Sequence, residues 1–418
     1  MSNPFESESP SAAPDHLTHA RARLRACVHC GFCNATCPTY TLSGDEREGP
    51  RGRLYLMNNV LAGTAQGADL TPLDHCLSCR SCETTCPAGV PYTEILDIVR
   101  EHTQELRPWH ERIRDRALAT ALGARRPLAA VLRMARRARR LAPPAWKRRI
   151  IPAEAGLVWP VARHARRVAL LQGCVQPALL PTLDIKAAII LDHLGISACA
   201  IGPHCCGALP YHLHAHEQGR ADAQEVLALY AAGAYDGLVS TATGCTAFLK
   251  DYPRLLATPD APGQGPGAAV REIAELIDPA VLPPLPPSAR RRIAWHAPCS
   301  LQHALKGAAR VEAILKALGH TLVPVAEAAL CCGSAGPYSL RHPRWGRALG
   351  RRKWKALTAQ APELIVTANV GCLQHLAGQG NIPVRHWIDL VYAALTNPDT
   401  DAHGLGSRAD QAPPSPVP

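Results

Sequence analysis

The sequence predicts an α+β multidomain protein in which a helical N-terminal domain precedes two duplicated α/β modules. Two observations lead to this prediction. Two cysteine runs of identical spacing lie before residue 90, and no strand pattern separates them. From residue 166 onward strand-like and helix-like segments alternate, and four cysteine landmarks recur 125 to 127 residues later, which indicates a duplication.

Composition and patterning divide the 418-residue chain into segments of different character. The expected segments are a disordered tail (1–18), a helical domain with the cysteine runs (19–106), an Arg-rich helical connector (107–165), a first module (166–256), a loop and linker (257–290), a second module (291–396) and a second disordered tail (397–418). Within the helical domain we expect helices over 17–26, 54–61 and 92–105, the second of them after the Gly/Pro-punctuated stretch Gly49–Arg53.

Both cysteine runs read Cys-x2-Cys-x2-Cys-x3-Cys-Pro. Bacterial ferredoxins hold cubane iron–sulfur clusters with this spacing, and the fourth cysteine of each run ligates the other cluster. The segment 19–106 is therefore predicted to be a helical two-cluster ferredoxin domain. Zinc sites or disulfides are the alternatives, but zinc sites usually use paired CxxC or Cys/His spacings. The predicted ligands are Cys27, Cys30, Cys33 and Cys86 for one [4Fe–4S] cluster, and Cys76, Cys79, Cys82 and Cys37 for the other.

The remaining landmarks place cysteines just after predicted strands. In the first module we expect strands over 168–172, 197–201 and 238–241 and helices over 185–194 and 221–232. Open α/β sheets gather ligands beyond their strand ends, so the cysteines of each module should meet in one pocket. Such a pocket suits a redox or metal site, whereas buried cysteines can also pack simply as small apolar residues. The candidates are Cys174, Cys205, Cys206 and Cys245 in the first module, and Cys299, Cys331, Cys332 and Cys372 in the second.

Several histidines lie near these cysteines, and we do not expect them to be ligands. Those of the first module are spaced by two residues and cannot share one helix face. They are His204, His212, His214 and His216, together with His296 and His303 in the second module.

The net charge of +11 is concentrated in the connector, above all in Arg133–Arg140. A basic helix can face nucleic acid, anionic lipid or an acidic partner, or simply water. The polar N-terminus does not resemble a signal peptide, and no apolar run is long enough to span a membrane. With 17 cysteines and no secretion signal, the chain is expected to be cytoplasmic and to use its thiols for metal ligation.

The two cysteine runs followed by two Cys-Cys-Gly modules resemble the iron–sulfur subunits of glycolate oxidase over residues 20–395. The matching stretches are Cys27–Cys33, Gly49–Arg53, Cys331–Gly336, Val366–Cys372 and His386–Ile388. Related subunits occur in glycerol-3-phosphate dehydrogenase, lactate-utilisation proteins and heterodisulfide reductase. Heterodisulfide reductase modules carry a further cysteine where this chain has Ala242 and Asn369, which argues against a noncubane cluster of that type.

The resemblance implies an electron-transfer subunit of a glycolate oxidase (glycolate dehydrogenase), with two [4Fe–4S] clusters and a further cluster or metal at the Cys-Cys-Gly modules. FAD and glycolate oxidation to glyoxylate are expected on partner flavoprotein subunits, with a quinone or similar acceptor downstream. The chain has no G-x-G-x-x-G fingerprint, no P-loop and no recognised nucleic-acid motif, so it should have no substrate site and no nucleic-acid partner. The alternative functions are an electron-transfer subunit of a lactate or glycerol-3-phosphate dehydrogenase and a heterodisulfide-reductase-like thiol redox enzyme. For the location, the alternative is peripheral attachment to the cytoplasmic face of the inner membrane.

Overall fold

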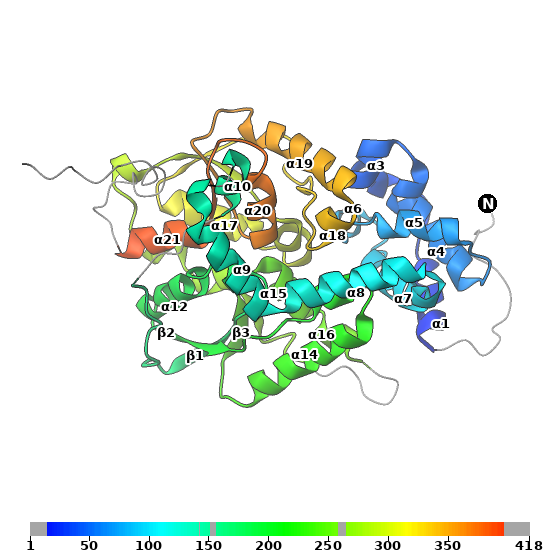
Figure 1. Ribbon diagram of the computed structural model, residues 1–418, viewed down its shortest axis with the longest axis horizontal. Coiled ribbons are helices and arrows are strands. Elements are labelled where there is room, and N and C mark those ends of the chain that lie inside the picture. The colour runs from blue at the N-terminus through cyan, green and yellow to red at the C-terminus, as the bar shows by residue number, and fades with distance from the viewer. Residues whose placement is uncertain (1–14, 142, 151–155, 258–264, 397–418) are drawn as a thin grey trace, which may run out of the picture.

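The structure is a computed structural model that describes residues 15–141, 143–150, 156–257 and 265–396. A helical N-terminal domain, a helical connector and two modules with a four-stranded parallel sheet each make up the molecule. In Figure 1 the N-terminal domain (blue) lies at one end, the connector (cyan) crosses the face of the molecule, and the two modules (green, and yellow to red) lie against each other. The predicted fold class is confirmed. The expected tail 397–418 and most of the expected tail 1–18 lie outside the described residues.

The N-terminal domain is entirely helical over its described residues. Its α-helices are α1 (Asp15–Leu24), α2 (Phe32–Ala35), α3 (Pro38–Ser43), α4 (Pro50–Leu61), α5 (Gly67–Asp74), α6 (Ser81–Thr85) and α7 (Tyr92–His102), with short 3₁₀ helices at Glu46–Glu48 and Gln104–Leu106. Helix α1 begins inside the stretch that was expected to be disordered. Leu17, Ala20 and Leu24 are buried in one apolar cluster with Ile95 and Val99 of α7, and this burial offsets the entropy of ordering the helix.

The connector contains helices, although its residues 156–165 carry none. Its elements are α8 (Trp109–Gly123), α9 (Arg125–Arg137), a 3₁₀ turn (Arg139–Leu141) and α10 (Pro144–Arg149). Arg136 of α9 donates hydrogen bonds to the carbonyl oxygens of Ala178 and Leu179, at 2.5 and 3.1 Å. Arg148 of α10 reaches Asn381 Oδ1 at 3.1 Å. The connector therefore touches both modules.

The first module is a parallel sheet with the strand order β2-β1-β3-β4. Its strands are β1 (Arg166–Leu171), β2 (Ile196–Ile201), β3 (Gly237–Ser240) and β4 (Val270–Glu272), and its helices are α11 (Gln176–Leu179), α12 (Leu183–His193), α13 (Ala208–His212), α14 (His216–Ala231), α15 (Thr243–Lys250) and α16 (Tyr252–Leu255). The last four residues of β1 and all of β3 are buried, as in sheets covered on both faces. Strand β4 lies in the stretch expected to be a linker, because three residues are too short to give a strand pattern.

The second module repeats this order as β6-β5-β7-β8. Its strands are β5 (Arg292–His296), β6 (Thr321–Val323), β7 (Leu364–Thr367) and β8 (Val384–His386), and its helices are a π-helical turn (Ser300–Ala304), α17 (Ala308–Ala317), α18 (Tyr338–Arg341), α19 (Pro343–Thr358), α20 (Val370–Ala377) and α21 (Trp387–Thr396). Short 3₁₀ helices at Ile273–Leu276, Pro279–Val281 and Pro287–Ala289 join the modules. The identical strand order confirms the duplication inferred from the cysteine offsets.

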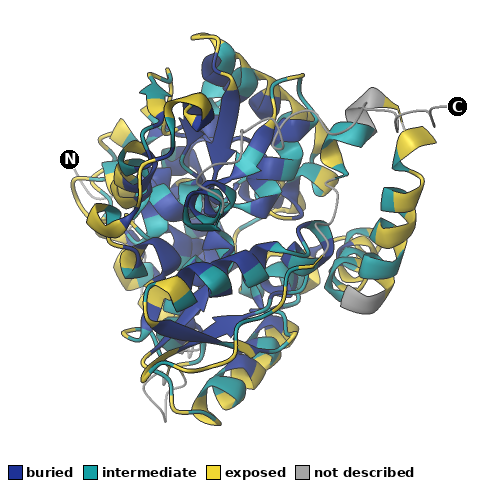
Figure 2. Ribbon diagram, turned by 90° about the vertical axis from the view of Figure 1, so that its left-hand side faces the viewer, coloured by how far each residue is buried: buried dark blue, intermediate teal, exposed yellow. Residues whose placement is uncertain are grey.

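The two modules share one hydrophobic core that runs from Val168 of β1 to Ala394 of α21. Lys186 of α12 forms an ion pair with Asp389 of α21 at 2.7 Å across the boundary between them. In Figure 2 the strands are buried (dark blue), while the outer faces of the surrounding helices are exposed (yellow). The modules thus form one body, and their sheets hold the cysteine loops in a constant relation.

A buried group of charged side chains joins the N-terminal domain, the connector and both modules. Arg107 donates to Asp74 Oδ1 at 2.6 Å, His214 of the first module lies 3.4 Å from the same oxygen, and Arg341 of the second module donates to Asp115 of α8 at 3.0 Å. Burial alone would raise the pKa of Asp74, but hydrogen bonds from His214 and Arg107 hold it well below the ordinary value. Asp74 is therefore an anion that compensates Arg107 of the connector and Arg341 of the second module, and it also contacts the ring of His214.

We expect Asp74→Asn to lower the free energy of unfolding by about 3–5 kcal/mol, because removing one partner of a buried pair leaves Arg107 and Arg341 undercompensated. Urea denaturation of the anaerobically purified chain measures the change. The matched control is Asp45→Asn, which removes an exposed partner of Arg47 and should leave the midpoint unchanged. Equal effects of the two substitutions would contradict a stabilising role for the buried group.

Candidate functional site

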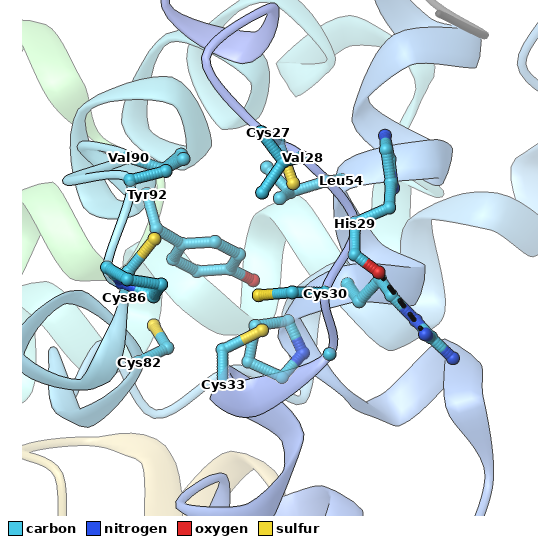
Figure 3. A pocket seen from close by; sticks show the side chains of 15 residues that line it. Cys27, Val28, His29, Cys30, Cys33, Leu54, Cys82, Cys86, Val90 and Tyr92 are labelled. Carbon is cyan, nitrogen blue, oxygen red and sulfur yellow. Dashed lines mark hydrogen bonds between the residues drawn. The ribbon is translucent and has the colours of Figure 1, made fainter. Parts of the chain in front are cut away.

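The first pocket of the N-terminal domain gathers cysteines from both runs. Cys27, Cys30, Cys33 and Cys86 line it, and Figure 3 shows them around the ring of Tyr92. The cavity opens to solvent beside Cys30, which is exposed. These are the four residues that the spacing predicts for one cluster.

The second pocket, about 340 Å³ in volume, holds the other predicted set. Cys37 of the first run and Cys76, Cys79 and Cys82 of the second line it. Cys82 lines the first pocket as well, as do Pro50 and Tyr92. The two pockets are therefore adjacent and share a wall.

The two runs have the same backbone conformation. His29 and Ser78, each placed just before the second cysteine of its run, have positive φ angles of 54° and 51°. The residues after the second cysteine, Gly31 and Arg80, are also left-handed, at 82° and 61°. Left-handed residues reverse the chain locally, so that each run curls around its pocket. The N–H of Ser78 points to Cys76 Sγ at 3.4 Å, as expected for a backbone that stabilises thiolate sulfur.

The Gly-Pro-Arg-Gly-Arg stretch supplies one cation to each pocket from the first turns of α4. Arg51 lines the first pocket, and Arg53 lines the second. Arg53 is fully buried, lies 3.8 Å from Cys37 Sγ and pairs with Glu48 at 2.9 Å. Gly52 between them has no room for a side chain, because a Cβ would lie 2.1 Å from the carbonyl oxygen of Glu46. The motif therefore positions two guanidinium groups beside two groups of thiols.

The residues of both pockets fit iron–sulfur clusters. Their donors are thiols, which prefer soft transition metals, and no carboxylate of the described residues lines either pocket. Burial raises the pKa of Cys33 to about 11 and raises the pKa values of Cys79 and Cys82 well above the ordinary value. Ionising these thiols therefore needs a bound cation. Tyr92 Oη is buried and has no hydrogen-bond partner among the described residues, so it offers an O–H to an acceptor in the pockets.

Each module also brings its four cysteines together, as the strand-end argument predicts. In the first module, Cys174 donates to Cys205 Sγ at 3.6 Å, and Cys206 hydrogen-bonds to the thiols of Cys205 and Cys245. Hydrogen bonds from Cys174, Cys206 and the backbone lower the pKa of Cys205. The first module thus contains four hydrogen-bonded thiols, and the Asp222 carboxyl also hydrogen-bonds to Cys205.

The backbone geometry of the Cys-Cys-Gly turn requires glycine at its third position. Gly207 and Gly333 have φ angles of 87° and 83°, and a Cβ would lie 2.2 Å from the Gly219 carbonyl oxygen or 2.7 Å from Leu349 Cβ. In this conformation their N–H groups point to Cys205 and Cys331 Sγ at 3.3 and 3.4 Å. The glycine allows the turn that directs both cysteines inward.

The thiol group of the second module lies against the second pocket. Its thiols form a hydrogen-bonded series in the order Cys299, Cys331, Cys332 and Cys372. Cys79 of the second pocket packs in one apolar cluster with Cys299 and Cys331. Thr84, in the same cysteine run, also hydrogen-bonds to His303 of this module at 2.9 Å. The second module therefore packs beside the second pocket, against its Cys79.

The histidines near the Cys-Cys-Gly modules differ in their contacts. His204 pairs with Glu225 at 3.0 Å, His214 belongs to the group around Asp74, and His303 contacts Thr84, so none of these lies among the thiols. His296 does, since its ring nitrogens, Cys332 Sγ and Cys372 Sγ include three atoms within 4.8 Å of one another. From the sequence, His296 was not expected to be a ligand. The available signal was that Leu171 occupies the corresponding strand position in the first module.

The positions that would carry an extra cysteine in heterodisulfide reductase modules are helix caps here. Ala242 precedes α15, and Asn369 caps α20 by accepting a hydrogen bond from Gly371 N at 2.8 Å. The Asn369 amide also donates to Thr243 Oγ1 of the first module at 3.2 Å. Of the 17 cysteines, only Cys199 stands outside the four thiol groups; it accepts from Arg167 at 3.6 Å.

Family comparisons match the same parts of the chain. Residues 23–90 match the 4Fe-4S dicluster domain, and residues 168–250 and 293–377 each match the Cysteine-rich domain. The two repeats of the second match correspond to the two modules.

Two relatives match most of this chain, and a third matches about half of it. The glycolate oxidase iron–sulfur subunit of Escherichia coli is 44% identical over 89% of this chain and 94% of its own length. The probable glycolate oxidase iron–sulfur subunit of Bacillus subtilis is 28% identical over the same shares. Lactate utilization protein A of Exiguobacterium is 24% identical over 51% of this chain and 89% of its own length. The pockets, the duplicated modules and the first of these matches together show that the chain belongs to the family of glycolate oxidase iron–sulfur subunits.

Proposed function

We propose that this chain is the electron-transfer subunit of a glycolate oxidase complex. It receives electrons from a flavoprotein subunit that carries FAD and oxidises glycolate to glyoxylate, and it passes them toward a quinone-type acceptor. The observation that carries the proposal is the pair of adjacent four-cysteine pockets that share Cys82, Pro50 and Tyr92. The name of the Escherichia coli relative supports the substrate.

The lining of the two pockets indicates which cysteines would ligate each cluster. Cys27, Cys30, Cys33 and Cys86 would hold one [4Fe–4S] cluster, and Cys37, Cys76, Cys79 and Cys82 the other. Bound there, the clusters supply one-electron transfer at potentials that depend on charge, hydrogen bonds and exposure. Arg51 and Arg53 offset the negative charge of the thiolates, and Arg53, being buried, does so with little screening by water.

The two pockets differ in exposure, which supports a direction of transfer. Val28 and Phe32, beside Cys30, are 69% and 63% exposed, so the first pocket has an apolar rim that is open to a partner. The second pocket has no exposed cysteine, and Leu330 and Cys331 of the second module pack in one cluster with its Cys79. We infer that the flavoprotein docks at the first pocket, and that the second lies deeper in the path.

The connector supports peripheral membrane attachment. No helix of the described residues is long and apolar enough to cross a membrane. In and just after α9, Arg133, Arg137 and Arg140 are exposed beside apolar residues that are also exposed, namely Val131, Met134 and Leu141. Interfacial helices combine basic and apolar side chains in this way. Attachment at the cytoplasmic face of the inner membrane would bring the chain near a quinone pool.

We expect the anaerobically purified chain to contain two [4Fe–4S] clusters. Cys30→Ser and Cys79→Ser should each lose about one cluster, because a hydroxyl oxygen is a poor ligand for iron in place of thiolate. Iron and sulfide analysis with EPR measures this. Cys199→Ser, which changes the cysteine outside all thiol groups, is the matched control. Full iron content in a variant that lacks all eight ferredoxin-type cysteines would refute the assignment.

The isolated chain should not oxidise glycolate, whereas addition of the flavoprotein subunits should restore electron flow from glycolate to a dye or a quinone. Dye reduction with glycolate, D- or L-lactate and glycerol 3-phosphate as separate substrates measures the choice of donor. A complex that prefers lactate or glycerol 3-phosphate would overturn the glycolate assignment. Glycolate oxidation by the flavin-free chain alone would overturn the division of labour between subunits.

Changing Arg133, Arg137 and Arg140 to Gln should weaken binding to anionic vesicles about 100-fold, since each basic residue near an anionic leaflet contributes about 1 kcal/mol. Co-sedimentation with anionic and with neutral vesicles measures the binding, which should also fall as salt rises. The matched control changes Arg344, Arg347 and Arg351, three exposed arginines of α19, to Gln. Equal binding to both kinds of vesicle, or equal losses in the two variants, would rule out membrane attachment through α9.

A further inference from the structure

The second module contains a compact group of nitrogen and sulfur donors that the first module lacks. His296 ends β5, Cys332 lies in the Cys-Cys-Gly turn, and Cys372 lies in the first turn of α20. One ring nitrogen of His296 and the two sulfur atoms lie within 4.8 Å of one another, and all three residues are buried. Three segments that are far apart in sequence thus converge on one point.

The imidazole of His296 is a buried polar group that lies among thiols. Both of its ring nitrogens are buried and have no hydrogen-bond partner among the described residues. A buried polar atom that is left unpaired costs about 1–3 kcal/mol. A neutral imidazole with a free nitrogen lone pair is the form that ligates transition metals.

The distances suit one ion. In a tetrahedral zinc site, with Zn–S near 2.3 Å and Zn–N near 2.0 Å, neighbouring ligand atoms lie about 3.5–4 Å apart. The three atoms here fall within 4.8 Å without a bound ion, so a small inward movement would close the site. Cys331 offers a further thiol, because its thiol hydrogen-bonds to that of Cys332.

The charges balance with Cys331 as the fourth ligand. A divalent ion with three thiolates and one neutral imidazole carries one negative charge. Lys353 of α19 is fully buried near these thiols, and its Nζ donates to the carbonyl oxygens of Glu327 and Ala328, both at 2.9 Å. Lys353 forms no ion pair with a carboxylate of the described chain, since Glu327 pairs with Arg352. Its charge therefore remains available to offset the site, as buried ions require.

The first module differs at both of these positions. Leu171 stands where the second module has His296, and Val226 stands where it has Lys353. Both replacements are apolar, although the four cysteines are retained. The duplicated modules have therefore diverged in the chemistry around their thiols.

We propose that the second module binds a single divalent transition-metal ion of the zinc class through His296, Cys332, Cys372 and Cys331. Binding releases the protons of the three thiols to solvent and changes no oxidation state. The inference goes beyond the electron-transfer function and does not depend on it. It also commits the thiols of the second module to a metal, so that thiol–disulfide exchange, if this chain performs it, belongs to the first module.

The test measures zinc in the full chain, purified anaerobically from zinc-supplemented cells with its clusters in place. Elemental analysis should give about one zinc ion per chain, and X-ray absorption at the zinc K edge should show sulfur and one nitrogen as neighbours, since the iron of the clusters does not contribute at this edge. His296→Leu, which installs the first-module residue, should reduce zinc at least tenfold. His386→Leu changes another fully buried histidine of the same sheet and should leave zinc unchanged.

His296→Cys keeps the proposal testable if His296→Leu does not fold. This variant should retain zinc, and its absorption spectrum should change to an all-sulfur shell. The proposal is overturned if the wild-type chain holds no stoichiometric zinc, if the wild-type shell contains no nitrogen, or if His296→Leu retains zinc with the same shell.

Discussion

The need to compensate buried thiolates shapes most of this molecule. Sixteen cysteines gather in four groups, and burial opposes the ionisation of most of their thiols. Each group has its own source of compensation. Arg51 and Arg53 stand beside the two pockets, backbone N–H groups point at Cys76, Cys205 and Cys331, and Lys353 lies beside the thiols of the second module. Glycines or left-handed residues occur where the backbone must turn toward sulfur.

Buried ion pairs also hold the domains together. A path for electrons requires pockets at constant separation, because the distance between carriers must not vary. The buried group around Asp74 and Arg107 connects the N-terminal domain to the connector and both modules, and Cys79 packs directly against Cys299 and Cys331. The shared core of the modules, with the ion pair of Lys186 and Asp389, completes a single rigid frame.

Duplication provided one scaffold for two thiol groups that have since diverged. The strand order and the positive φ of Gly207 and Gly333 are the same in both modules. The surroundings of the thiols are not the same, since the first module has Leu171 and Val226 at the positions where the second has His296 and Lys353. The contact between Asn369 and Thr243 shows that the third landmark now serves the interface between the modules.

Much of this could be predicted from the sequence, because spacing between neighbouring residues expresses local geometry. The cysteine runs predicted which thiols share a pocket, and the constant offset predicted the duplication. Strands β4 and β8 were not predicted, because a segment of three residues is too short to show the alternating pattern of a strand. The roles of Arg53, Tyr92, His296 and Lys353 could not be predicted either, since each depends on side chains that only the fold brings beside it. Only the folded sheets bring a histidine at the end of β5 to thiols 36 and 76 residues later, because parallel strands converge at one edge regardless of sequence distance.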